Sequence, residues 1–92
     1  MKEQQIQKKI IDHLTKDGYI VVNLIKTNCN WIPDLLATKQ WKALWVEVKK
    51  PWGVLSVLQK FRIKKLRENW DTVLIPYSFE EFITLYWELC EL

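Results

Sequence analysis

The spacing of apolar residues predicts three helices. Between residues 3 and 16 an apolar side chain recurs every four positions, and the run stops at Asp17-Gly18, where a glycine is a common helix terminator. Ser56-x-x-Gln59 is a capping-box sequence, so a second helix is expected to begin near Val57 and to carry Leu58, Phe61 and Leu66 as its apolar positions. Ser78-x-x-Glu81 is a second capping box and opens a terminal helix.

Four further runs predict strands. The segment from Tyr19 to Ile25 is β-branched and almost wholly apolar, which is typical of a buried strand, and a polar loop follows it. Asp34 to Thr38 and the alternating segment from Ala43 to Lys49 give two more strands, and Thr72 to Ile75 gives the fourth. The predicted order is therefore αβββαβα.

The two middle strands bring charged side chains together. An antiparallel hairpin that turns around Gln40-Trp41 places Asp34 opposite Glu47, and the two-residue period puts Lys49 on the same face as Glu47. Opposed carboxylates destabilise a sheet unless a cation compensates them, and carboxylates with a backbone carbonyl such as that of Val48 suit Mg²⁺ or Mn²⁺. The lysine could then hold or deprotonate an attacking water or stabilise charge on a phosphate. The alternative is an ordinary ion pair between the glutamate and the lysine on a solvated sheet surface.

Three motifs with fixed spacing favour the first interpretation: Pro-Asp-Leu-Leu at 33–36, Glu-Val-Lys-Lys-Pro at 47–51 and Gly-x-Leu-Ser-x-x-Gln at 53–59. Together they closely resemble the virus-type replication-repair nuclease (VRR-NUC) domain of the PD-(D/E)xK superfamily, over roughly residues 3 to 75. The resemblance implies that Asp34 and Glu47 bind the metal, that Lys49 serves the nucleophilic water and that Gln59 completes the site. It also suggests Glu3 as a further ligand, although a helix dipole explains an acid in a first turn equally well.

The resemblance implies a restriction-endonuclease-like αβββαβ core, in which helices flank a mixed sheet, and the terminal helix is an addition to it. Residues 1–92 would form a single VRR-NUC-like nuclease domain. Two points stay open. Gln59 has a purely structural explanation as a helix cap, and Trp31 occupies a position where the family commonly has glycine. The indole there could narrow the mouth of the site, stack on a base or simply pack as a core or interface aromatic.

Charge is divided between segments in a way that the net value of +3 conceals. Seven basic residues and no acid lie between Lys49 and Arg67, whereas six acids and no base lie between Glu68 and Leu92. The basic block is expected to bind DNA phosphates beside the metal site without reading sequence. A solvated helix face is the alternative. The candidate DNA-binding residues are Lys50, Lys60, Arg62, Lys64, Lys65 and Arg67.

The acidic terminal helix is expected to lie away from DNA. Six tryptophans, three tyrosines and three phenylalanines are more aromatic surface than a 92-residue core is expected to hide. We expect Phe79, Phe82, Tyr86 and Trp87 to form a patch that is buried in a two-fold symmetric homodimer. The alternative is a monomer whose exposed aromatics stack on flapped or single-stranded bases.

Several classes of protein are excluded. One histidine, His13, cannot support a zinc finger or a serine triad, and is expected to be a partly buried structural residue. Two glycines cannot form a phosphate-cradling loop, so a nucleotide cofactor is not expected. Cys29 and Cys90 lack metal-ligand spacing and are expected to be reduced and structural. No stretch is long enough to span a membrane and the amino terminus predicts a polar helix, so the expected location is the cytoplasm, that of a bacterial host if the chain is phage-encoded.

The sequence therefore predicts a Mg²⁺- or Mn²⁺-dependent DNA endonuclease. By resemblance to a family that includes junction-cleaving members, branched DNA such as a four-way junction of the kind met in DNA repair is the expected substrate. The alternatives are a basic nucleic-acid-binding module without catalysis, a monomeric flap or nicking nuclease, and a small structural protein that associates through its tryptophans.

Overall fold

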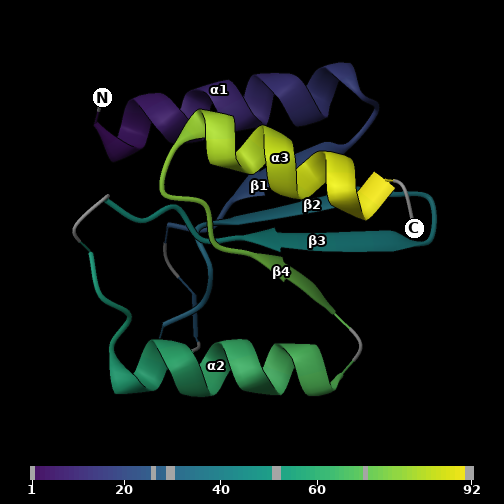
Figure 1. The fold of residues 1–92 in the computed structure, drawn as a ribbon. Coiled ribbons are helices and arrows are strands. Elements are labelled where there is room, and N and C mark those ends of the chain that lie inside the picture. The colour runs from purple at the N-terminus through teal and green to yellow at the C-terminus, as the bar shows by residue number, and fades with distance from the viewer. Residues whose placement is uncertain (1, 26, 29–30, 51–52, 70, 91–92) are drawn as a thin grey trace.

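A computed structural model describes residues 2–25, 27–28, 31–50, 53–69 and 71–90. Its elements follow the αβββαβα order expected from the sequence (Figure 1). They are α1 (Glu3–Lys16), β1 (Ile20–Asn23), β2 (Leu35–Lys39), β3 (Lys42–Val46), α2 (Val57–Glu68), β4 (Thr72–Leu74) and α3 (Phe79–Cys90).

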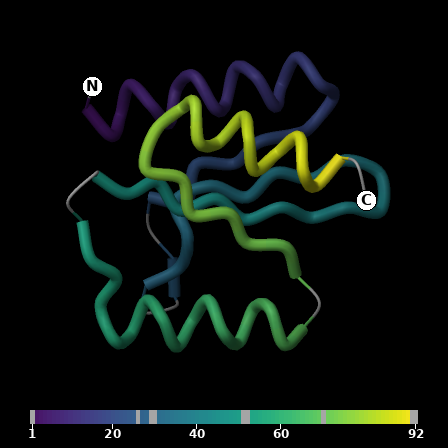
Figure 2. Tube along the Cα trace, in the orientation of Figure 1, coloured from purple at the N-terminus to yellow at the C-terminus, as the bar shows by residue number. Residues whose placement is uncertain are grey.

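The strands form one mixed sheet in the order β1-β2-β3-β4. The first three strands pair antiparallel and β3 pairs parallel with β4. Helices α1 and α3 cover one face of the sheet, whereas α2 lies on the opposite face against β4 (Figures 1 and 2). The acidic helix α3 is thus separated by the sheet from the basic helix α2, as the charge pattern led us to expect.

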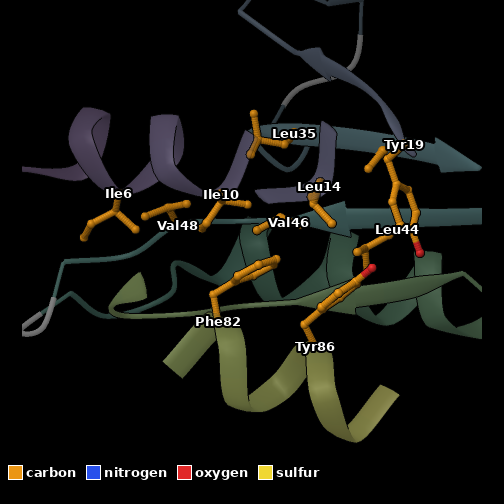
Figure 3. Close-up of a cluster of buried hydrophobic side chains, with 11 residues drawn as sticks. Ile6, Ile10, Leu14, Tyr19, Leu35, Leu44, Val46, Val48, Phe82 and Tyr86 are labelled. Atoms are coloured by element: carbon orange, nitrogen blue, oxygen red, sulfur yellow. The ribbon is translucent and has the colours of Figure 1, made fainter. Parts of the chain in front are cut away.

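The hydrophobic core lies between the sheet and the pair α1 and α3 (Figure 3). Alternation along β2 and β3 sends one side chain in two toward these helices, which is the half-buried strand pattern. Each helix contributes a stripe of residues one turn apart. The most deeply buried members are Ile10, Leu14, Leu35, Val46 and Phe82.

The prediction that the first apolar run forms a buried strand is wrong. Strand β1 is an edge strand, and Ile20 and Ile25 are 71% and 88% exposed. Only one face of β1 meets the core, through Val21 and the preceding Tyr19. The other face stays uncovered because α2 packs there against β4, at the opposite edge of the sheet. An apolar run indicates a strand but carries no information about which neighbour covers it.

The aromatic patch expected on α3 is also largely wrong. Phe82 and Tyr86 are buried in the core of the same chain, where their rings stack at 5.6 Å. His13 packs edge-on against these two rings and against Phe79, which confirms its structural role. Only Trp87 of the four is exposed, so α3 offers little apolar surface to a partner.

Two remaining sequence expectations concern the thiols and the membrane. Cys90 is a free and exposed cysteine, whereas Cys29 lies outside the described residues. Among the residues that the structure describes, no helix has the length and the apolar character needed to cross a bilayer.

Candidate active site

The site lies at the open end of the β2–β3 hairpin. The register places Leu35 opposite Val46, so Asp34 and Glu47 stand opposite each other one residue beyond the last ladder pair. This confirms the hairpin and its turn at Gln40-Trp41, although both strands end slightly earlier at this end than the sequence suggested. The segment after β3 continues beside β4, because the amide of Glu47 donates to the carbonyl of Leu74 at 2.9 Å.

Two reciprocal hydrogen bonds fix the carboxyl groups. The amide of Asp34 donates to Oε1 of Glu47 at 3.2 Å, and the amide of Val48 donates to Oδ2 of Asp34 at 3.0 Å. Each carboxyl group thus accepts from the backbone of the opposite strand. The two side chains are therefore held toward each other by the same hairpin that brings them together.

Gln59 reaches the site from the first turn of α2. Its Oε1 accepts from the amide of Ser56 at 2.8 Å, while Oγ of Ser56 accepts from the amide of Gln59 at 3.1 Å, which completes the capping box. Its Nε2 donates to Oε2 of Glu47 at 3.3 Å. The helix cap expected from the sequence is therefore present, and the other end of the same amide contacts the glutamate, so capping does not prevent a role in the site.

Burial controls the protonation of Glu47. Its side chain is only 4% exposed, and burial raises its pKa to about 8, with a side-chain hydrogen bond to Asp34 and the repulsion of the Asp34 charge as further causes. The positive charge of Lys49 acts in the opposite direction and lowers this pKa. A buried glutamate that accepts two hydrogen bonds is not half of a solvated surface ion pair, so that alternative does not fit the geometry.

The donor set fits a hard divalent cation. The charge of Asp34 opposes ionisation of Glu47, and a cation with oxygen ligands would offset this repulsion. The amide of Val48 holds Oδ2 of Asp34, which keeps the Asp34 carboxyl group beside that of Glu47 for such an ion. The carbonyl of Val48 remains the expected third ligand.

The structure does not group Glu3 with Asp34 and Glu47 as a metal-binding set. Glu3 lines a hollow beside α1 and the end of β1, together with Gln7 and Asn23. No group of three or more His, Cys, Asp or Glu side chains suited to a metal ion occurs among the residues that the structure describes. Asp34 and Glu47 therefore remain a pair, and the acid in the first turn of α1 has the helix dipole as its explanation.

The basic residues of α2 do not form one uniform surface. Lys60 and Lys64 line a shallow groove of about 500 Å³ whose apolar floor includes Ile63. Arg67 is also at this groove, but its Nη2 donates to the carbonyl of Val73 at 2.9 Å and ties the end of α2 to β4. Lys65 forms an exposed ion pair with Glu68 at 3.6 Å. Neither of these two structural roles could be predicted from the sequence pattern.

With this geometry in place, the architecture can be compared with solved structures. One described as a VRR_NUC domain superposes with a TM-score of 0.82 at 23% sequence identity, over 91% of this chain and 92% of that chain. This chain has the VRR-NUC fold. The superposition supports the resemblance noted in the motifs, at the level of fold. No family model and no curated protein matches the sequence.

The backbone conformation at Trp31 explains why glycine is common at this position in the family that the motifs resemble. Trp31 has a φ of 51°, in the left-handed region where glycine is at no disadvantage and a β-carbon is crowded. It precedes the buried Pro33 and the acidic Asp34, so it sets the direction from which the chain enters the site. The resemblance singled out this position, and the backbone conformation supplies a physical reason for a glycine there.

Proposed function

We propose that this protein is a metal-dependent DNA endonuclease that hydrolyses phosphodiester bonds at the end of the β2–β3 hairpin. One observation carries the proposal: Asp34 and Glu47 are locked face to face by backbone amides, and Gln59 completes the cluster from α2. Structural ion pairs do not require two adjacent acids, one of them buried, whereas phosphoryl-transfer sites commonly use adjacent acids to hold a divalent ion. The VRR-NUC fold supports this chemistry by analogy with the solved domain that shares it.

Each residue then has a role in hydrolysis. A bound Mg²⁺ or Mn²⁺ would neutralise charge on the phosphate oxygens and lower the pKa of water. Asp34, Glu47 and the carbonyl of Val48 would hold that ion. Lys49 lies close enough for its charge to lower the pKa of Glu47, and it would hold the attacking water or stabilise charge that develops on the phosphate. Gln59 acts as a positioning residue, because its amide fixes one oxygen of Glu47.

DNA would approach from the side of α2. Lys60 and Lys64 lie one turn apart on the groove beside the site, where they can contact phosphates without reading bases. Exposed Lys50 follows the catalytic segment directly and extends this positive surface. The acidic helix α3 lies across the sheet, where it does not oppose the approach of a polyanion (Figure 1).

The proposal includes a substrate class and an assembly. Branched DNA such as a four-way junction offers two symmetry-related strands, and a two-fold homodimer would present one site to each. Because the aromatics of α3 are mostly internal, the physical support for a dimer now comes from the open edge of β1. Its exposed Ile20 and Val22 and its unpaired backbone groups are features that a second copy could cover.

The test is cleavage of matched junction, flap, linear and supercoiled DNA by purified protein in Mn²⁺, in Mg²⁺ and in chelator, with sedimentation equilibrium at micromolar protein. The proposal predicts metal-dependent incision, strongest on the junction, and twice the monomer mass. DNA binding without incision in either metal would instead indicate a binding module. A monomeric mass with a preference for flaps would contradict the dimeric junction nuclease and would indicate a monomeric flap or nicking nuclease instead.

A further inference from the structure

Helix α2 exposes apolar side chains that its sequence pattern assigned to the core. Ile63 is buried against the sheet, whereas Phe61 and Leu58 remain 48% and 42% exposed. Val57 and Val54 beside them are more exposed still. Because the core of the chain is built on the other face of the sheet, these residues do not stabilise it. An apolar cluster on the most basic element of the chain therefore needs another explanation.

Phe61 is the centre of this cluster. The guanidinium carbon of Arg62 lies 5.9 Å from the centroid of its ring, and Nζ of Lys65 lies 5.7 Å from it. Both distances are within the range of a cation–π interaction. A half-exposed ring with two cations against it offers a flat apolar surface and positive charge at the same place.

We propose that Phe61 stacks on an unpaired base of the nucleic-acid substrate, while Arg62 and Lys65 contact the phosphates of that nucleotide. A base has an apolar face and a neighbouring negative charge, which is the combination that this cluster complements. Lys65 can leave the ring for a phosphate at little cost, since its exposed pair with Glu68 holds it only weakly. The inference rests on the proposed nuclease function and narrows its substrate to DNA with bases outside the duplex.

Charge decides between a nucleic acid and a protein partner. The segment from Lys49 to Arg67 contains seven basic residues and no acid, so a polyanion is favoured at its surface. Gln59 precedes Phe61 by two residues on one helix, so the two side chains point to different sides of α2 but keep a constant separation. A base held on Phe61 therefore places the strand that carries it at a fixed distance from the catalytic pair, and the contact would select where incision occurs.

The test measures binding in chelator, where no cleavage takes place. A junction with 2-aminopurine at an unpaired position and a fully paired duplex of equal length are titrated with wild type, Phe61→Ala and Phe61→Trp. We expect Phe61→Ala to bind the junction roughly 5-fold or more weakly and to lose the fluorescence quenching that stacking causes, with little change on the duplex. Phe61→Trp should restore both signals.

Trp87→Ala is the matched control, because Trp87 is an exposed aromatic residue on the opposite side of the sheet. It should leave both signals unchanged. Unchanged junction binding and quenching in Phe61→Ala would overturn the proposal. So would a halved molecular mass in Phe61→Ala with intact DNA binding, since the cluster would then belong to an interface between two copies. Failure of the nuclease function itself would appear separately, as absent cleavage in metal while these binding differences persist.

Discussion

Gln59 serves two neighbours through the two ends of one amide. It caps α2 through Ser56 and holds an oxygen of Glu47. Ser56→Ala removes only the cap and should cost about 1 kcal/mol of unfolding free energy while cleavage is retained. Gln59→Ala removes both contacts, so it should cost similar stability and also lower the cleavage rate roughly 10- to 100-fold. Urea unfolding and single-turnover cleavage of both variants measure this difference. An equal loss of rate in the two variants would show that the contact with Glu47 has no catalytic role.

Glu47 makes the stability of the metal-free protein depend on pH. Its pKa rises from 4.5 to about 8 on folding, so between these values the folded chain keeps a proton that the unfolded chain has released. Stability should therefore fall as pH rises from about 4.5 to 8 and level off above that range. Urea unfolding in chelator should show this decline in wild type and a flatter profile in Glu47→Gln. Mn²⁺ should stabilise wild type most at the upper end of the range. Parallel profiles for wild type and the variant would exclude Glu47 as the titrating group.

Trp31 occupies its left-handed conformation at a cost. Trp31→Ala and Trp31→Gly both remove the indole, but only glycine relieves the crowding at a φ of 51°. The glycine variant should be the more stable of the two by about 1 kcal/mol in urea unfolding. An unstrained loop position has the opposite order, because glycine increases the entropy of the unfolded chain. Finding alanine more stable would thus contradict the strain.

At the scale of elements, local patterns predicted what local forces determine. Apolar spacing and strand-like runs, together with capping boxes and a terminal glycine, identified all seven elements, and a two-residue turn identified the pairing that opposes Asp34 and Glu47. Neither the edge position of β1 nor the exposure of Phe61 could be predicted, because the first depends on the order of the strands and the second on which face of the sheet α2 covers. Both are set by contacts between residues distant in the chain, such as the hydrogen bond from the amide of Glu47 to the carbonyl of Leu74.

Helix α2 provides the prediction at this scale. Reversing the charge of Lys60 and Lys64 to Glu should weaken DNA binding on every sequence and reduce the slope of log affinity against log salt by about 2. The matched control reverses Lys8 and Lys16, two exposed lysines of α1 on the other face of the sheet, and has the same net charge. Its slope should stay near that of wild type. Equal losses in both double variants would mean that net charge, and not the groove of α2, determines binding.

At the scale of the whole molecule, the residues that stabilise the fold and the residues proposed for catalysis lie on opposite faces of the sheet. One face carries the core with α1 and α3 (Figures 1 and 3). The other face carries the basic helix α2 and the carboxyl pair that Gln59 of this helix contacts. Substitutions at Asp34 or Glu47 remove no side chain of this core, so the variants should fold. The acidic helix α3 and the basic helix α2 are separated in the same way, and the face with α2 is the one that we propose for DNA.

The most direct test of the central claim is the rate of junction cleavage in Mn²⁺ by wild type, Asp34→Asn and Glu47→Gln, each confirmed as folded by circular dichroism. Each substitution removes a ligand of the metal ion, which stabilises the transition state by several kcal/mol, so the cleavage rate should fall roughly 100-fold or more in both variants. DNA binding should be retained or become tighter, because each substitution removes a negative charge. Cleavage at the wild-type rate by folded Glu47→Gln, free of contaminating nuclease, would contradict the assignment of this site.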